Sequence, residues 1–305
     1  MAPMGLGTVA GTGLPSCTVV IPTRDRPVML ADCLESIARS DYPLDLLDVV
    51  VVDDGAVGDA RPAGVDAVCD RLDVSLLESN GRGPSAARNL GASEARGSVL
   101  LFTDDDCRVD AQWLRTLTLS IRDTPTSAAG GRIVNQLGDN RWSTASQRVI
   151  DIVYVYYNAD PARATFVASN NLAVHADAFR KFGGFDEEFR WAEDRDFCRR
   201  WLAAGCELIY VPAAIVEHAH RLTGQAFVRQ QFAYGRGAFH FHRTAARNGD
   251  SQAARTRGFY SNVPRIARRV GAGKGAARVA LEIGGWQLAN AAGFAWEAIC
   301  ARFGR

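Results

Sequence analysis

The sequence predicts an α/β fold in which a mostly parallel central sheet is flanked by helices. Between residues 17 and 106, short apolar runs alternate with stretches of helical spacing, and this alternation is typical of βαβ units. Three of the first four runs end in acids or a glycine-rich turn. Because strands of a parallel sheet are buried on both faces, these polar residues are expected at one edge, where ligands bind. The 305 residues are 47% hydrophobic and 23% charged, as in an ordinary globular protein.

The first two predicted strands both lead into polar segments. Residues 17–21 form a β-rich run that ends at Pro22, and a helix is expected soon after it. The second apolar run covers residues 46–52 and is followed by Asp53 and Asp54. Both segments therefore contribute polar groups to the predicted binding edge.

The third predicted strand, residues 74–77, leads into a glycine-rich turn and then a helix. In this turn Gly81, Gly83 and Ala86 match the dinucleotide fingerprint G-x-G-x-x-[GA]. That match would indicate an NAD(P)-dependent oxidoreductase, although the fingerprint normally follows the first strand of its unit and not the third. With either function, the backbone N–H groups at the helix start favour an anion.

The fourth apolar run, residues 98–102, ends abruptly in three consecutive aspartates. In an extended segment Asp104 and Asp106 point to one side and Asp105 to the other. Two like charges about 4 Å apart repel by roughly 4 kcal/mol at an effective dielectric constant of about 20, and a divalent cation would remove that repulsion. Because an all-oxygen site suits Mg²⁺ or Mn²⁺, we expect a D-x-D metal site. The alternative is a solvated acidic turn that caps the helix expected from about Ala111.

The middle of the chain continues the pattern. A fifth strand is expected over residues 128–134, where two glycines suggest close approach by a ligand or another backbone. Helical spacing of apolar residues predicts a helix over residues 143–158. Residues 166–174 are typical of an extended segment, which places Asn170 and Asn171 in mid-strand. Amides are usually on the surface, and a pocket is the other option for them.

Two further groups of titratable residues follow. Glu193 and Asp194 lie in the first turn of a predicted helix, where the helix dipole alone favours acids. His218 and His220 lie at the end of a predicted strand, where their rings point to one side. That arrangement suits a metal or phosphate site as well as two structural histidines. The two short strands expected before them cover residues 208–211 and 214–216.

Charge and cysteine content describe the chain as a whole. The net charge of +1 conceals a basic C-terminal part, since the only acid between Arg221 and Arg278 is Asp250. Such asymmetry suggests an anionic partner, either membrane lipid or nucleic acid. Seven scattered cysteines without a C-x-x-C pair argue against a disulfide framework and a zinc site, and for a reducing compartment. No apolar run reaches the length of a membrane span.

Taken in order, these motifs resemble those of the family 2 glycosyltransferases of the GT-A fold. Each motif alone is weak, but their order and spacing together are specific, and the resemblance covers about residues 17–220. The matching segments are residues 19–24, 51–55, 80–81 with 87–91, 102–106, 169–171, 183–186 and 193–196 with Arg199.

The resemblance implies roles for individual residues. The residues that bind the nucleotide would be Pro22, Thr23, Arg24, Asp53, Asp54, Asn80, Gly81 and Arg88. Within this set Asp54 would accept a hydrogen bond from the base edge, and Arg88 would flank the base. The ligands of Mg²⁺ or Mn²⁺ on the donor diphosphate would be Asp104, Asp106 and His218. Asp194 would be the catalytic base, with Glu193 beside it. The residues that face the acceptor would be Asn170, Asn171 and Trp191.

The resemblance further implies an inverting, hexosyltransferase-type enzyme. It would move a sugar from a UDP-, GDP- or dTDP-sugar to a hydroxyl of a glycan, lipid-linked or small-molecule acceptor. The chemistry agrees, because a metal ion neutralises the leaving diphosphate and a distant carboxylate accepts the acceptor's proton, which is worth roughly 10²–10⁴-fold. A non-catalytic nucleotide-sugar-binding module is the alternative, besides the oxidoreductase.

Three regions are expected along the chain. They are a disordered tail over residues 1–16, a GT-A domain over 17–222 and a basic amphipathic helical extension over 223–305. Basic amphipathic helices either lie on an anionic membrane or pack on the domain. The expected location is therefore the cytoplasm, with peripheral contact to the inner face of the cell membrane as an option. The expected setting is polysaccharide biosynthesis for the cell envelope, with no nucleic acid partner.

Overall fold

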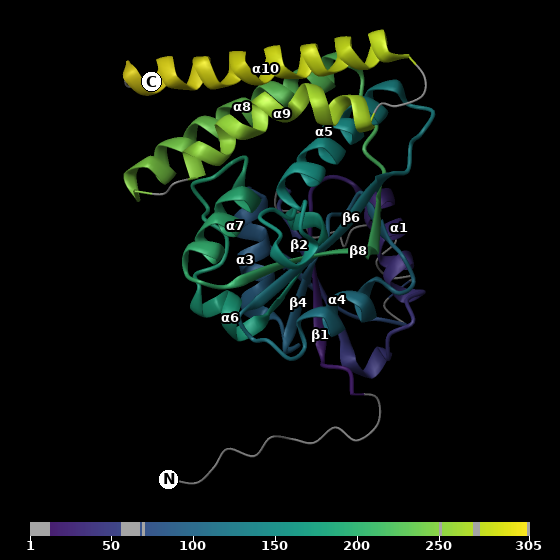
Figure 1. Cartoon of the computed structure of the whole chain (residues 1–305). Helices are drawn as coiled ribbons and strands as arrows, with labels where there is room; N and C mark the ends of the chain where they lie inside the picture. Colours follow the sequence, from purple (N-terminus) through teal and green to yellow (C-terminus); the bar gives the residue numbers. More distant parts are fainter. Residues whose placement is uncertain (1–12, 56–67, 69–70, 250–251, 271–274, 304–305) are drawn as a thin grey trace.

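The computed structural model describes residues 13–55, 68, 71–249, 252–270 and 275–303. Its centre is an eight-stranded sheet with the strand order β3-β2-β1-β4-β7-β6-β8-β5. The strands are β1 (Cys17–Thr23), β2 (Leu47–Asp53), β3 (Asp73–Glu78), β4 (Val99–Phe102), β5 (Cys107–Val109), β6 (Ser127–Asn135), β7 (Leu172–His175) and β8 (Glu207–His218). The α-helices are α1 (Pro27–Ala38), α3 (Pro84–Glu94), α4 (Trp113–Ile121), α5 (Arg141–Tyr157), α6 (Ala176–Lys181), α7 (Glu193–Ala203), α8 (Gly224–Arg247), α9 (Gln252–Val270) and α10 (Ala276–Arg302). Figure 1 shows helices on both faces of the sheet, with α8, α9 and α10 stacked together above it.

The first half of the sheet has the predicted βαβ pattern. Strand β1 pairs in parallel with β2 and β4, and β2 pairs in parallel with β3. Every residue of β1 is buried, because its alternate side chains face two separate cores. Val19 belongs to the core that includes α1 and α4, whereas Val20 belongs to the core that includes α6 and α7. The predicted α/β fold, a sheet between helical layers, is confirmed.

The carboxyl ends of these parallel strands meet at one edge, as the sequence predicts. Thr23 at the end of β1 lies beside Asp53 at the end of β2, which in turn lies beside Glu78 at the end of β3. On the other side of β1, the backbone N–H of Thr103 donates to the carbonyl oxygen of Val20 at 3.3 Å. The acids that follow β2 and β4 therefore flank the end of β1.

The second half of the sheet brings a remote residue to the same region. Strand β7 pairs antiparallel with both β4 and β6, and β5 pairs antiparallel with β8. In the last pair Cys107 lies opposite His218. Because β5 follows the three aspartates directly, this pairing sets His218 next to Asp106.

Two predicted segments differ from the observed structure. The two short strands expected at 208–211 and 214–216 form one strand, β8, whose pairing with β6 shifts register between Gly131 and Arg132. Pro212 explains the irregularity, because proline cannot donate to the ladder and is tolerated at a bulge. The extended segment expected at 166–174 contains a 3₁₀ turn, η3 (Ser169–Asn171), before β7 begins. Asn170 and Asn171 therefore precede a strand instead of lying within it.

The close approach expected at the glycines of β6 comes from the protein itself. A Cβ atom on Gly131 would lie 1.9 Å from the carbonyl oxygen of Ala214, and one on Gly130 would lie 2.3 Å from the Cβ of Val167. These glycines thus permit tight packing of backbone and side chains, and they do not mark a ligand site.

The C-terminal helices pack on the rest of the chain. Helices α5, α8, α9 and α10 share one apolar cluster, which includes Ile152, Phe227, Phe259, Ile266 and Trp286. Of the two arrangements expected for the basic helices, packing against the domain is therefore present. Among the described residues, no helix combines the length and the apolar character needed to cross a bilayer.

The predicted disordered tail lies mostly outside the described part of the chain, which begins at residue 13. Within the described part, Leu14 is buried with the core beneath β1. The Tyr42 hydroxyl donates to the carbonyl oxygen of Pro15 at 2.5 Å. The packed part of the chain therefore includes residues before the expected boundary at residue 17.

Candidate active site

The three aspartates after β4 form a turn and are not extended. The backbone N–H of Cys107 donates to the carbonyl oxygen of Asp104 at 3.1 Å, which closes this turn. As a result, the side chains of Asp104, Asp105 and Asp106 have different partners. The expectation of an extended segment over these aspartates is therefore wrong, whereas the D-x-D metal site stays a prediction.

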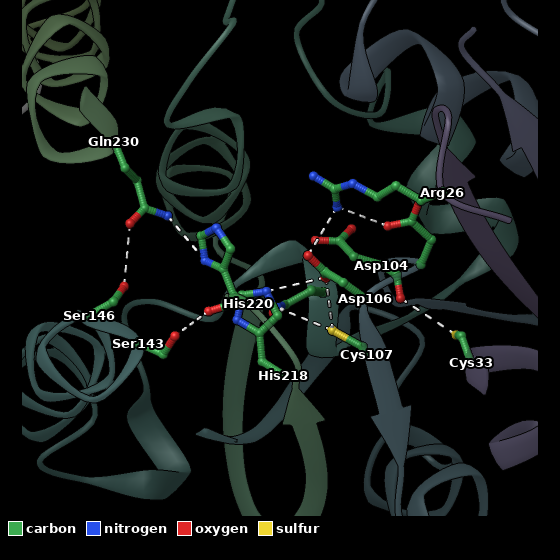
Figure 2. Close-up of polar contacts among 12 residues, drawn as sticks. Arg26, Cys33, Asp104, Asp106, Cys107, Ser143, Ser146, His218, His220 and Gln230 are labelled. Atoms are coloured by element: carbon green, nitrogen blue, oxygen red, sulfur yellow. Dashed lines mark hydrogen bonds and ion pairs between the residues drawn. The ribbon is translucent and has the colours of Figure 1, made fainter. Parts of the chain in front are cut away.

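Asp106 pairs with His218. The Asp106 Oδ1 atom lies 3.2 Å from His218 Nε2, and both side chains are mostly buried. Burial opposes the charged carboxylate, but the hydrogen bond and charge of His218 and the charge of Arg26 lower the pKa of Asp106. Burial alone would lower the pKa of His218. The hydrogen bond and charge of Asp106 outweigh burial, so that the pKa of His218 is raised. Figure 2 shows the two side chains directed at each other from β8 and the end of the acidic turn.

A divalent cation fits this pair. One ligand atom from each of Asp106, Cys107 and His218 lies within 4.8 Å of the others. Burial raises the pKa of the Cys107 thiol well above its usual value, and a protonated thiol is a poor ligand. The carboxylate oxygen and the imidazole nitrogen remain as donors. Carboxylates suit Mg²⁺ and Mn²⁺, and imidazole adds affinity for a transition metal.

Arg26 is a site residue that the sequence did not reveal. Its Nη1 atom lies 3.1 Å from Asp105 Oδ1 and 3.0 Å from Asp106 Oδ2. Asp105 also accepts a hydrogen bond of 2.7 Å from the Thr23 hydroxyl. The repulsion expected among the aspartates is thus partly relieved by an arginine. The contact of Arg26 with the aspartates could have been expected from the adjacency of β1 and β4, because this adjacency brings together the residues that follow the two strands.

Arg88 connects the aspartates to the start of α7. Its guanidinium donates to Asp104 at 2.6 Å and to Glu193 at 3.1 Å. The side chain is almost fully buried, and its guanidinium carbon lies 5.8 Å from the centre of the Phe185 ring. The guanidinium is therefore committed to two carboxylates, where the resemblance implied a contact beside the base.

Asp194 occupies the first turn of α7, directly after an unusual backbone conformation. Ala192, the residue that precedes the helix, has a φ of 68°, a strained value for alanine. The Asp194 carboxylate accepts the N–H of Arg195 at 2.7 Å. Burial and the neighbouring charge of Glu193 raise the pKa of Asp194 to about 7, against the opposing effects of Arg195 and Arg88. A carboxyl group with a pKa near neutrality is suited to accept a proton.

The residues implied for the nucleotide gather at the ends of β1, β2 and β3. Asp54 is buried, accepts from the Ser79 hydroxyl at 2.6 Å and from the Gly83 N–H at 3.0 Å, and lies 4.0 Å from Arg24. Asp53 accepts from the Gly55 N–H at 2.8 Å. The remaining members are Pro22 and Thr23, which are buried, and Asn80 and Gly81, which are exposed and have positive φ angles.

A cavity of about 570 Å³ joins several of these groups. Asp104, Arg88 and His218 line it together with Glu193, Asp194, Trp191 and Asn170. Asn171 is not among the lining residues. Its buried amide accepts from the Trp113 indole N–H at 2.8 Å and donates to the carbonyl oxygens of Arg132 and Ala214. Asn171 therefore holds β6, β7 and β8 together instead of facing the cavity.

The second histidine, His220, lies beside His218. The rings of His218 and His220 are 5.0 Å apart, and burial lowers the pKa of His220 to about 4, so that His220 is neutral. Gln230 of α8 lies 3.5 Å from His220 Nδ1, and its amide also donates to the Tyr234 hydroxyl at 3.2 Å. Figure 2 shows Gln230 approaching His220 from the C-terminal helices.

Comparisons of the sequence with known proteins agree on one family. The family model described as glycosyl transferase family 2 matches residues 18–183. The glycosyltransferase AglE of Haloferax volcanii is 26% identical over 226 residues, which are 73% of each chain. The pre-mycofactocin glycosyltransferase of Mycobacterium tuberculosis is 30% identical over 72% of this chain. That alignment covers only 46% of the mycobacterial protein, so the chain matches less than half of this relative.

Solved structures show the same fold. The mannosyltransferase PcManGT from Pyrobaculum calidifontis, in complex with GDP-Man and Mn²⁺, superposes with a TM-score of 0.63 at 19% identity, over 94% of this chain and 84% of its own. GalNAc-T7 with UDP, GalNAc and Mn²⁺ gives a TM-score of 0.56 at 20% identity, over 73% of this chain and 47% of its own. Likeness at this identity shows the GT-A fold alone.

Proposed function

The chain belongs to glycosyl transferase family 2, and on that premise we propose that it is an inverting, metal-dependent enzyme that uses a nucleotide-diphosphate sugar. The observation that carries the proposal is the shared cavity, which Asp104 and His218 line together with Asp194. The phosphate end of a donor and the hydroxyl of an acceptor can therefore occupy one space. Proximity of this kind lowers the barrier to transfer.

The donor's nucleotide binds at the ends of the parallel strands. Asp54 and Thr23 supply acceptor and hydroxyl groups there, and the exposed turn at Asn80 and Gly81 leaves room for a base. Arg24 is exposed beside Asp54 and is free to contact a ribose or phosphate. The donor is a UDP-, GDP- or dTDP-sugar. GDP-Man and UDP in the two neighbouring structures support this class.

Asp106 and His218 hold Mg²⁺ or Mn²⁺ in this proposal, with Asp104 close by. The supporting observation is the 3.2 Å contact between a carboxylate oxygen and an imidazole nitrogen. Both neighbouring structures were solved with Mn²⁺. When bound, the cation offsets the charge that develops on the diphosphate leaving group. In the absence of other cations, Arg26 partly neutralises the charge of the Asp106 carboxylate.

Asp194 acts as the general base that accepts the proton of the acceptor hydroxyl. Glu193, held by Arg88, keeps a second negative charge beside it and so raises its pKa. The hydroxyl then displaces the nucleoside diphosphate directly, which inverts the configuration at the anomeric carbon. Asn170 and Trp191 face the acceptor, which carries its hydroxyl on a glycan, lipid-linked or small molecule. The proposed donor carries a hexosyl group, and no nucleic acid partner is expected.

The oxidoreductase alternative loses its main support. The N–H of Gly83 in the glycine-rich turn already donates to the carboxylate of Asp54 at 3.0 Å. A carboxylate at this point would repel a pyrophosphate, so the turn is poorly suited to a dinucleotide. The non-catalytic binding module remains, and turnover distinguishes it from an enzyme.

The test is hydrolysis of a sugar-nucleotide library with Mn²⁺, with Mg²⁺ and with EDTA. We expect metal-dependent hydrolysis of one donor class. The Asp106→Asn variant should lose at least about 100-fold, because charge stabilisation by a metal is worth several kcal/mol. Asp123→Asn, at a carboxylate that is 80% exposed, is the matched control and should retain activity. Hydrolysis that survives both EDTA and Asp106→Asn would contradict the metal role, and binding without turnover would favour the non-catalytic module.

A further inference from the structure

We infer that the acceptor is amphipathic, with a hydroxyl-bearing head near Asp194 and a compact hydrophobic group in a chamber formed by α5, α9 and α10. The inference rests on the proposed function and specifies the acceptor class. It follows from the composition of the cavity wall, which combines charged residues beside Asp194 with apolar side chains of α5, α9 and α10. The chamber residues used below are Val149, Ile150, Val153, Phe259 and Trp286.

The chamber belongs to the acceptor side of the site. Pro22, Thr23 and Asp54, which are assigned to the nucleotide, do not line the cavity, whereas Asp194 and Trp191 do. The volume of about 570 Å³ is therefore shared between the phosphate end and sugar of the donor and the molecule whose hydroxyl reaches Asp194. A cavity of this size encloses a small ligand almost completely.

Aliphatic and aromatic side chains together form the far wall. Val149, Ile150 and Val153 project from α5, and Phe259 and Trp286 come from α9 and α10. A glycan would require hydrogen-bonding partners for its hydroxyls, and each unpaired group buried there would cost free energy. The aromatic rings could stack on a sugar, but they would leave its buried hydroxyls unpaired, and the aliphatic side chains offer no stacking contact. A hydrophobic group fits this wall better than a second sugar.

Three hydroxyls of this wall already have partners. The Tyr154 hydroxyl accepts from the Ala168 N–H at 3.0 Å. The Tyr260 hydroxyl donates to Asn290 at 3.2 Å, and the Thr165 hydroxyl donates to the carbonyl oxygen of Tyr157 at 2.7 Å. The tyrosines therefore present mainly their rings to the cavity. Burial of apolar surface, at roughly 25 cal/mol per Å², becomes the main source of affinity there.

Two buried amide oxygens distinguish the head end of the cavity. Among the described residues, nothing donates to Asn170 Oδ1 or to Gln231 Oε1, although both side chains line the cavity and are more than nine-tenths buried. Buried acceptors are normally paired. Hydroxyl groups on the head of the acceptor would satisfy both oxygens while one hydroxyl faces Asp194.

The experiment compares phenyl and methyl glycosides of the same sugars. The sugars are glucose, galactose, mannose and N-acetylglucosamine, and binding is followed by tryptophan fluorescence in the presence of Mn²⁺ and nucleoside diphosphate. We expect the best phenyl glycoside to bind at least about tenfold more tightly than its methyl partner, because burial of a ring exceeds the 1.4 kcal/mol that tenfold requires. Equal affinities in all four pairs would overturn the inference.

Two variants on one helix localise the effect. Val153→Asn places an amide in the chamber and should reduce the phenyl preference to less than about threefold. Val155→Asn makes the same substitution on the same helix, at a side chain that is 43% exposed and absent from the cavity wall, and should keep the full preference. If Val153→Asn lowers the melting temperature more than its control, Val153→Ala replaces it and should weaken phenyl binding alone. A preference that survives these chamber variants would overturn the assignment.

Hydrolysis of the donor separates this inference from the proposed function. Wild-type protein that hydrolyses a sugar nucleotide with Mn²⁺, yet binds phenyl and methyl glycosides equally, would retain its proposed function and lose the apolar chamber. Protein that binds phenyl glycosides preferentially but hydrolyses no sugar nucleotide would retain the chamber and lose the catalytic assignment.

Discussion

At the scale of single residues, the site is organised by the pairing of buried charges. Asp104 is paired with Arg88, Asp105 with Thr23 and Arg26, and Asp106 with His218. Removing one member of such a set leaves a buried charge without a partner, which usually costs more than the pair contributes. Asp194 differs from these acids, because its pKa is raised by burial and by Glu193.

The raised pKa of Asp194 predicts a pH dependence. The base must be deprotonated, so kcat/KM should rise with pH, level off above pH 7 and fall about tenfold per pH unit below it. Asp194→Asn should remove this acidic limb and lower the rate of transfer by roughly 10²–10⁴-fold. The measurement is a pH–rate profile of transfer from pH 5 to 9.

Glu188→Gln is the control for this prediction, because Glu188 is an exposed acid before the same helix. It should leave both the rate and the profile unchanged. An acidic limb that persists in Asp194→Asn would assign the base to another group.

The residues that the sequence could identify are those whose neighbours follow from the chain itself. Asp104, Asp106 and Asp194 stand at the ends of predicted elements, and the edge on which the first two lie follows from the parallel sheet. Arg26 could not be found in this way, because its contact with Asp106 depends on how a turn folds. The link from Arg88 to Glu193 joins residues 105 positions apart, and no local pattern encodes it.

At the scale of elements, α8 and α10 cross at glycines. A Cβ atom on Gly235 would lie 2.0 Å from the carbonyl oxygen of Asn290, and one on Gly293 would lie 1.9 Å from that of Phe232. Glycine at both points lets the backbones approach closely. Because Trp286 and Asn290 of α10 line the cavity, this crossing also fixes the position of the acceptor wall.

Gly293→Val should therefore push α10 away from α8. We expect a loss of stability of about 1–3 kcal/mol from overpacking, with transfer reduced more than donor hydrolysis, since α10 contributes only to the acceptor side. Gly284→Ala is the control in the same helix, because a Cβ atom there would meet nothing within 4 Å. Thermal melts and the two rates are the measurements, and equal behaviour of the variants would refute the crossing.

Helical elements were predicted more reliably than irregular ones. The spacing of apolar residues was enough to predict α5, and its observed bounds of Arg141–Tyr157 are close to the expected 143–158. The bulge at Pro212 and the 3₁₀ turn at Asn170 and Asn171 were not predicted. Both depend on where a strand meets its neighbours, which is a tertiary contact and not a periodicity.

At the scale of the whole molecule, the outer face of α10 is apolar. Leu281 and Leu288 are each 75% exposed, and Trp296 is 55% exposed. The two acids of this helix turn inward, where Glu282 pairs with Arg148 and Glu297 pairs with Arg236. Figure 1 shows α10 on the far side of α8 and α9 from the sheet. We propose that this face rests on a membrane surface, where the basic residues between Arg221 and Arg278 would favour anionic lipid.

The membrane proposal predicts binding to vesicles that contain anionic lipid. The triple variant Leu281→Gln, Leu288→Gln, Trp296→Gln should lower the bound fraction at least about tenfold, because each side chain loses apolar contact with the bilayer. Val28→Gln is the control, since Val28 is 74% exposed on α1. Flotation is the measurement, and full binding by the triple variant would end the proposal.

The central claim is that a cation held by Asp106 and His218 lies at the edge of the cavity that His218 and the general base Asp194 both line. A crystal structure with Mn²⁺ and the preferred nucleoside diphosphate tests it most directly. The account predicts Mn²⁺ coordinated by Asp106 and His218, the diphosphate bound to the ion, and the Asp194 carboxylate facing the vacant sugar position. A cation bound elsewhere, or an Asp194 side chain that points away from the diphosphate, would contradict the account.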